Sequence, residues 1–303
     1  MCRKIYIILM LIPGFFTGGL KGQDQVTTKA DSARIITSDI GHFWRAFDLL
    51  QTQHTTADSL KAIETIFVRH ASEGLRQYMK AANCYATSYL DAIRKRKTDY
   101  LKIRDSTETL AGKKKLIVQY LRKFKYLYPS LKIPVICLTI GKFEVGGSQF
   151  GNTLYIGSEV DLLRNVDITA QTIHELAHFQ QKDQNPMTNL DLAMIEGGAE
   201  FVCYQVTGKR TLSSTWAYGL THERFLWNEF QPKMDSAIDM KWFQDVTDPA
   251  TGRPGSLGYF IGFKICESYL QDHRKKKTAL IELIEMDNPK KIYLSSLYNS
   301  NKN

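Results

Sequence analysis

The sequence predicts an α+β protein in which a mainly helical N-terminal portion precedes a small sheet and further helices. Apolar residues recur at helical spacing from residue 42 to about 104, a stretch with few glycines and no proline. A β-branched apolar run follows at residues 135–140, and a second strand pattern follows at residues 152–157. Helical patterns return after that, so the strands are confined to one part of the chain.

The composition is that of a globular protein. The 303 residues are 43% hydrophobic and 23% charged, which excludes collagen-like, low-complexity and wholly disordered chains. Five cysteines without a CxxC pair exclude a disulfide-dense miniprotein and a cysteine-type zinc ribbon. No RNA-binding motif and no Gly-rich phosphate motif occurs, so we expect no nucleic-acid partner.

Residues 1–22 have the order of a secretory signal peptide. Arg3 and Lys4 precede an apolar run of about 12 residues, and small residues follow up to Gly22. A membrane anchor would need about 20 apolar residues, so the run is too short to span a bilayer. We therefore expect an exported protein, periplasmic or secreted, with no stable membrane span after signal removal. Loss of the basic residues Arg3, Lys4 and Lys21 would lower the formal charge from +9 to +6.

The exported chain would keep four cysteines. In an oxidising compartment they can pair in three ways or remain four buried thiols, and the sequence does not choose between these alternatives. They are Cys84, Cys137, Cys203 and Cys266.

We expect four regions: the signal peptide at residues 1–22, a flexible polar segment at residues 23–38, a helical region at residues 39–130 and a C-terminal region at residues 131–303. A helix is predicted at residues 110–126, where Tyr128-Pro129 ends it. Two further helices follow the strands. One should run from near Asp167 to about Lys182, and the next from a capping box of Thr188 with Asp191 to Gly208. Later helices are predicted at residues 221–230, 257–271 and 278–286.

The first of those two helices carries His174-Glu175-Leu176-Ala177-His178. Histidines four residues apart lie on one helix face, so both imidazoles can reach one ion while Glu175 projects toward a bound water. The motif occurs by accident in about 1% of chains of this length. The alternative is a helix with two buried, hydrogen-bonded histidines.

A catalytic zinc ion generally takes three protein ligands and leaves one position for water. Glu196 follows on the next helix, 18 residues after His178, and Glu200 lies one turn further on. Glu200 could accept the remaining N–H of a ligand histidine and fix its tautomer. The residues between these two glutamates are Gly197, Gly198 and Ala199, which would let two helices approach closely.

These two motifs together resemble those of the gluzincin metallopeptidases. The resemblance implies a zincin-like catalytic region within residues 131–303, one Zn²⁺ per chain bound by His174, His178 and Glu196, Glu175 as general base, and Glu200 behind a ligand histidine. Metzincins match poorly, because Gln181 and Gln184 stand where Gly and His would be required.

Over residues 130–290 the chain looks most like the bacterial exported predicted Zn-dependent proteases of unknown specificity. It lacks an aminopeptidase Gly-x-Met-x-Asn segment and a thermolysin-type substrate loop, so substrate preference cannot be carried over from those enzymes.

Two further roles are predicted around the metal. Tyr259, at the start of a helix, is our preferred hydrogen-bond donor to the oxyanion, although it could equally be a core tyrosine. The other candidates are Tyr218, His222 and Arg253. Leu154, Tyr155 and Ile156 could form an edge strand that pairs with extended substrate, or an ordinary buried strand.

The function predicted from these residues is hydrolysis of peptide bonds through a zinc-bound water, with a peptide or protein as substrate. One alternative is a zinc hydrolase acting on a non-peptide amide or a cell-wall component. A second alternative is a binding or assembly protein that keeps the scaffold without turnover. The intact Glu175 disfavours the second alternative, because a pure binding site does not need a base. The sequence leaves the oligomeric state open.

Overall fold

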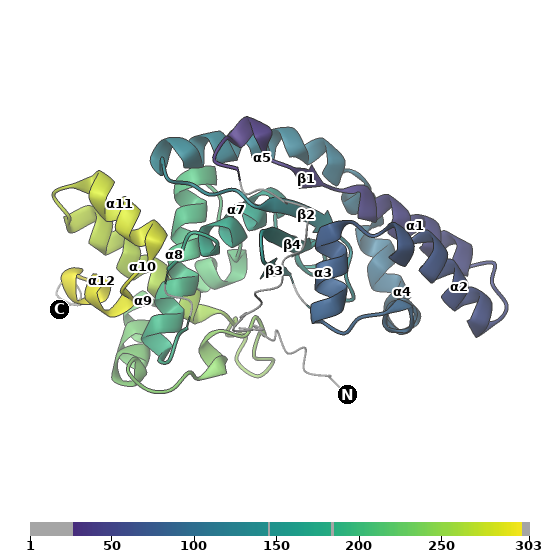
Figure 1. The fold of residues 1–303 in the computed structure, drawn as a ribbon. Coiled ribbons are helices and arrows are strands. Elements are labelled where there is room, and N and C mark those ends of the chain that lie inside the picture. Colours follow the sequence, from purple (N-terminus) through teal and green to yellow (C-terminus); the bar gives the residue numbers. More distant parts are fainter. Residues whose placement is uncertain (1–26, 145, 183–184, 299–303) are drawn as a thin grey trace. The chain divides into compact units, whose positions relative to one another are not determined.

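The structure, a computed structural model, describes residues 27–144, 146–182 and 185–298. The predicted signal peptide lies outside these residues. The described chain forms two compact units, residues 27–122 with 132–172 and residues 123–131 with 173–298 (Figure 1). The expected boundary near residue 131 stays a prediction.

The first unit contains a small mixed sheet in the order β1-β2-β4-β3. Strands β1 (Ile35–Ile36) and β2 (Val135–Thr139) are parallel, as are β2 and β4 (Thr153–Gly157). Strand β3 (Gly147–Phe150) runs antiparallel to β4 at the other side. All residues of β2 and β4 are buried, which matches their continuous apolar runs.

Helices dominate the N-terminal portion of this unit, as the sequence predicts. The Phe43 ring packs against Phe67 and Tyr100, with ring centroids 5.5 and 5.1 Å apart. Buried aromatic rings of this kind explain why the helical periodicity is strong here. The helices of this unit are α1 (Ser38–Leu50), α2 (Thr56–Ile66), α3 (Glu73–Ala81), α4 (Ala86–Glu108) and α6 (Ser158–Leu163), with 3₁₀ turns at Ala30–Ser32 and Val68–His70. Helix α5 (Leu110–Leu127) begins in this unit, and its residues from 123 onward belong to the second.

Two details of this unit differ from expectation. The described part of the segment at residues 23–38, where no strand was expected, contains β1, which pairs in parallel with β2, with Ile36 opposite Cys137. Strand β3 was missed, because its sequence contains glycine and polar residues that look like a turn. The predicted α+β class, with a small mixed sheet and a mainly helical N-terminal portion, is confirmed.

The second unit is a helical assembly. Helix α7 (Ile168–His178) begins in the first unit, and its residues from 173 onward belong to the second. The other helices of the second unit follow α7 in the sequence. The remaining helices are α8 (Asn189–Thr207), α9 (Ser213–Phe230), α10 (Leu257–Asp272), α11 (Lys276–Glu285) and α12 (Pro289–Ser295), with 3₁₀ turns at Gln231–Lys233 and Met240–Trp242.

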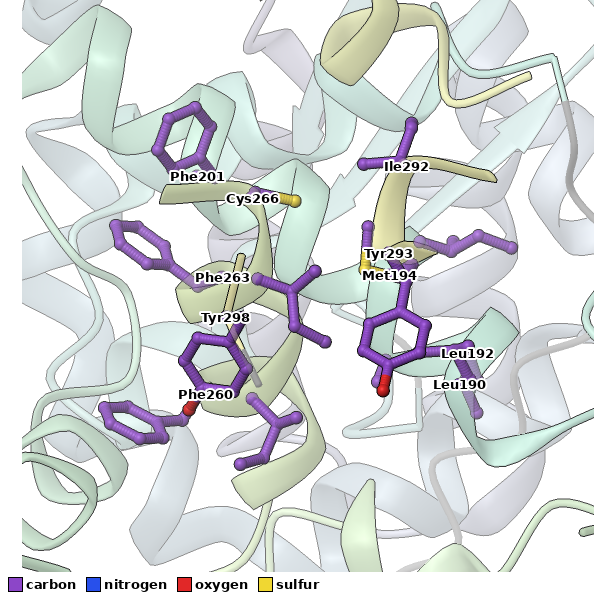
Figure 2. Close-up of a cluster of buried hydrophobic side chains, with 14 of the residues drawn as sticks. Leu190, Leu192, Met194, Phe201, Phe260, Phe263, Cys266, Ile292, Tyr293 and Tyr298 are labelled. Carbon is purple, nitrogen blue, oxygen red and sulfur yellow. The ribbon is translucent and has the colours of Figure 1, made fainter. Parts of the chain in front are cut away.

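Helices α8 and α10 form the core of this unit. Figure 2 shows Phe201 of α8 and Phe263 of α10 among the buried side chains, and their rings are 5.2 Å apart. A Cβ at Gly197 would overlap the backbone of Gly262, and a Cβ at Gly262 would overlap the Ala193 carbonyl. The close approach expected from the glycines of α8 is therefore made with α10.

The ends of α7 and α8 follow local signals. Thr188 accepts a hydrogen bond from Asp191 N (3.2 Å) and Asp191 accepts one from Thr188 N (3.0 Å), which confirms the capping box. Gly208 caps the C-terminus of α8 with φ of 74°. Helix α7 ends at His178, earlier than expected, because the next residues tighten into i→i−3 bonds such as Gln181 N to His178 O (3.1 Å).

The four cysteines named above are free and buried, so the structure contains the thiols and not the disulfides. Within the described residues, no helix is both long and apolar enough to cross a membrane.

Candidate metal centre

Helix α7 brings two imidazoles together. The Nε2 atoms of His174 and His178 are 3.2 Å apart, because residues four apart project from one face of the helix. His174 is 4% exposed, whereas the side chain of His178 is 23% exposed. Both rings therefore point one nitrogen toward a common position, and the His178 ring is the more exposed of the two.

Helix α8 supplies a carboxylate to the same position. Glu196 Oε2 lies 3.2 Å from His178 Nε2 and 3.7 Å from His174 Nε2. A tetrahedral zinc ion with bonds of about 2.0–2.1 Å requires ligand atoms roughly 3.3–3.4 Å apart. The three separations fall around this value, so His174, His178 and Glu196 could hold one metal ion.

Glu200 holds the far side of His174. Its carboxylate, which is fully buried, accepts a hydrogen bond from His174 Nδ1 (3.2 Å). It also accepts from the backbone N–H of Thr211 (2.6 Å) and from the Thr211 hydroxyl (2.7 Å). Because a carboxylate accepts only, His174 carries its proton on Nδ1 and leaves the Nε2 lone pair for a metal.

Gln181 contacts the second histidine. Its Oε1 is 2.8 Å from His178 Nδ1, and its Nε2 donates to the carbonyl of Ile195 (2.8 Å). The turn that ends α7 at His178 brings this side chain back beside the helix.

Three electron-pair donors facing one another need a cation among them. The pKa of His174 is raised to about 10: burial lowers it, but the carboxylates of Glu196 and Glu200 outweigh burial. The pKa of Glu196 is lowered, although burial acts to raise it, because both imidazoles face its carboxylate. In the metal-free protein a proton takes this position, so a proton and a metal ion are alternative occupants.

Glu175 and Tyr259 lie beside this group. Glu175, partly buried on α7, directly follows His174, and the charge of its carboxylate contributes to the raised pKa of His174 and of His178. Tyr259, on the first turn of α10, lies nearly parallel to the His174 ring with centroids 6.2 Å apart. Burial and the nearby Glu196 carboxylate raise the pKa of Tyr259 far above its usual value, so it stays a protonated donor.

The other three oxyanion candidates are engaged elsewhere. Arg253 forms an ion pair with Glu229 (2.8 Å). Tyr218 stacks on His222 with ring centroids 4.0 Å apart, at a kink of α9 where His222 leaves helical geometry. Tyr259 is the candidate whose ring stacks beside a histidine of the candidate metal centre.

The expectation of an edge strand at Leu154–Ile156 is wrong. Strand β4 lies between β2 and β3, and both of its edges are hydrogen bonded to them. Leu154, Tyr155 and Ile156 are at most 1% exposed, so their backbone cannot pair with a substrate. The misplacement came from missing β3, which is the strand at that side of the sheet.

Sequence reasoning missed two residues of the site. Gln181 served only to exclude metzincins, although a polar residue three positions after the second histidine can return to that ring from a tight helix end. Thr211 had no local signal, because it reaches Glu200 only through the path of the loop after α8.

The three candidate ligands have the arrangement that the gluzincin resemblance implies, with two histidines on one helix and a glutamate on the next. Residues 141–289 match the family described as "Predicted Zn-dependent protease (DUF2268)". This segment includes every residue of the candidate centre. The resemblance to the predicted Zn-dependent proteases is therefore confirmed for this segment, and the family description supports a zinc-dependent protease.

Among curated proteins, the chain is similar to "Uncharacterized protein YjaZ" of Bacillus subtilis (strain 168). The two are 27% identical over 125 residues, which cover 39% of this chain and 46% of that relative. The chain thus spans less than half the length of the relative. No solved structure matches significantly.

Proposed function

We propose that the protein is a zinc-dependent metallopeptidase that hydrolyses peptide bonds with Glu175 as general base. The observation that carries this proposal is the convergence of His174 Nε2, His178 Nε2 and Glu196 Oε2 within 3.2–3.7 Å of one another. Glu175 directly follows His174 in the sequence, and its charge contributes to the raised pKa of both histidines. One zinc ion per chain would bind there.

Bound zinc would supply Lewis acidity, polarising a carbonyl and lowering the pKa of water. Glu175 would accept a proton from the attacking water and deliver it to the leaving nitrogen. The partial exposure of Glu175 and His178 suits this role, because water and substrate must reach these groups.

Tyr259 would stabilise the reacting carbonyl oxygen. Its raised pKa keeps the hydroxyl protonated, so it can donate a hydrogen bond as negative charge develops on that oxygen. Burial, which raises this pKa, also strengthens such a hydrogen bond.

We further propose that the protein acts after export, in the periplasm or outside the cell, on a peptide or protein. The pattern of the first 22 residues supports export. Mass spectrometry of the N-terminus of the protein recovered from its native host tests this proposal. An N-terminus near residue 20–23 is expected, and an intact cytoplasmic chain contradicts export.

Metal analysis with a peptide-library digest tests the activity. We expect one zinc per chain, cleavage products from the parent protein, and zinc retention with loss of cleavage for Glu175→Gln. Zinc binding without any peptide cleavage would favour a hydrolase of non-peptide amides or cell-wall components. A protein that binds no metal would instead favour a binding role.

A further inference from the structure

A neutral side chain, that of Gln181, contacts the side of His178 that faces away from the other candidate metal ligands. Gln181 Oε1 lies 2.8 Å from His178 Nδ1, and Gln181 Nε2 donates to Ile195 O at 2.8 Å. Gln181 is 6% exposed, so water competes little for either bond. Its amide thus joins the end of α7 to the turn of α8 directly before Glu196.

The Ile195 carbonyl fixes which way the amide points. A carbonyl oxygen accepts hydrogen bonds only, so the NH₂ group of Gln181 must face it. The reversed amide would place two oxygens against each other in a buried position, which is unfavourable. Gln181 Oε1 is therefore the atom that faces His178.

The orientation of the amide in turn fixes the protonation of the ring. An amide oxygen also accepts only, so His178 must carry a proton on Nδ1 and donate it to Gln181. In the neutral ring, which is the form that binds a metal, Nε2 is then the nitrogen that keeps a lone pair, and it lies 3.2 Å from Glu196 Oε2.

We infer that Gln181 is a positioning residue for the metal centre: it sets the tautomer of His178 and locks α7 to the part of α8 that presents Glu196. This inference rests on the proposed zinc site. It assigns the two histidines different supports, because His174 donates to the anionic Glu200 and His178 to a neutral amide. Glutamate at position 181 could accept from His178 but could not donate to Ile195 O, and leucine could do neither.

Zinc affinity of Gln181 variants tests the inference without relying on turnover. Competition against a chromophoric chelator should show zinc bound about 10 to 100-fold more weakly by Gln181→Leu. Gln181→Glu should fall between Gln181→Leu and the parent, because it keeps the acceptor for Nδ1. The visible absorption spectrum of the cobalt-substituted Gln181→Leu protein should differ from that of the parent, since the ring of His178 is less constrained.

Gln180→Leu is the matched control. Gln180 is also buried, at 8% exposed, and its amide donates to the Leu176 carbonyl of α7. This variant should keep the parental zinc affinity and cobalt spectrum. Equal losses in the two leucine variants would show that any buried glutamine at this helix end has the same effect, and would overturn the inference. The inference would also be overturned if Gln181→Leu bound zinc as tightly as the parent protein. The same holds if Gln181→Glu bound zinc no more tightly than Gln181→Leu.

The ring nitrogens of His178 provide a measurement on the parent protein should Gln181→Leu fail to fold. In the zinc-loaded parent, ¹⁵N NMR should show Nδ1 carrying a proton that exchanges slowly with water, and rapid exchange contradicts the inference. If the parent protein binds zinc but cleaves no peptide, the proposed function is contradicted. The zinc affinities of the Gln181 variants then still decide this inference. A parent without zinc affinity refutes both.

Discussion

Glu196 and Glu200 lie one helical turn apart on α8 but contact opposite sides of His174, so their replacement should separate metal binding from stability. Glu196 Oε2 faces Nε2 of both histidines, whereas Glu200 Oε2 is 3.2 Å from His174 Nδ1. Glu196→Ala removes a proposed ligand of the zinc ion. Glu200→Ala removes only the group that orients a ligand.

The magnitudes follow from these contacts. Loss of an orienting partner typically weakens metal binding by about 10 to 100-fold, or about 1.4–2.7 kcal/mol, so Glu200→Ala should fall in this range. Glu196→Ala should exceed it, because an anionic ligand is lost outright. Glu200→Ala also leaves the buried N–H of Thr211 without its acceptor, which costs about 1–3 kcal/mol of folding free energy.

Two measurements on each variant decide the matter. Chelator competition gives the zinc dissociation constant, and urea unfolding of the metal-free protein gives the stability. Glu229→Gln, which alters an ion pair with Arg253, is a control that should leave zinc affinity unchanged. The reasoning is refuted if Glu200→Ala loses zinc as severely as Glu196→Ala, or if neither variant loses it.

Three other outcomes are expected. The folded pKa of His174 in the metal-free protein is raised to about 10, so the stability gained from its protonation is complete below pH 6.5 and is lost as pH rises toward 10. Melting temperature of the metal-free protein should fall over this range while zinc affinity rises, and a flat profile for both contradicts the coupling. Gly262→Ala places a Cβ against the Ala193 carbonyl and should destabilise the protein by more than about 3 kcal/mol in urea unfolding; near-parental stability would show that α8 and α10 can separate freely. Tyr259→Phe should lower kcat by about 100-fold or more while zinc stays bound, and unchanged kcat would remove Tyr259 from the reaction.

Much of the candidate centre could be predicted because its first two ligands are related by helix geometry alone. The spacing of His174 and His178 places both on one face wherever a helix forms, and the sequence on either side favours one. The capping box at Thr188 and the left-handed cap at Gly208 could also be predicted from the sequence, because each depends on residues within one turn.

The sheet could be predicted only in part. The buried strands β2 and β4 have apolar β-branched sequences, whereas β1 has two residues and β3 contains glycine and polar residues. Their strand character comes from pairing with neighbours distant in sequence, such as Ile36 opposite Cys137. The prediction that β4 is an edge strand was wrong because β3, which pairs with β4, could not be recognised from its sequence.

The sequence by itself determined the chemical groups available to this protein: two imidazoles on one helix face, a carboxylate that follows the first of them and two glutamates on the following helix. Only the tertiary structure decided that Glu196 faces the Nε2 atoms of both histidines, and that Glu200 and Gln181 contact the Nδ1 atoms of these rings. It also decided that Gly197 of α8 packs on α10. Spacing within a helix is set by bonds along the chain. Distances between helices are set by the packing of side chains far apart in sequence, which no local pattern encodes.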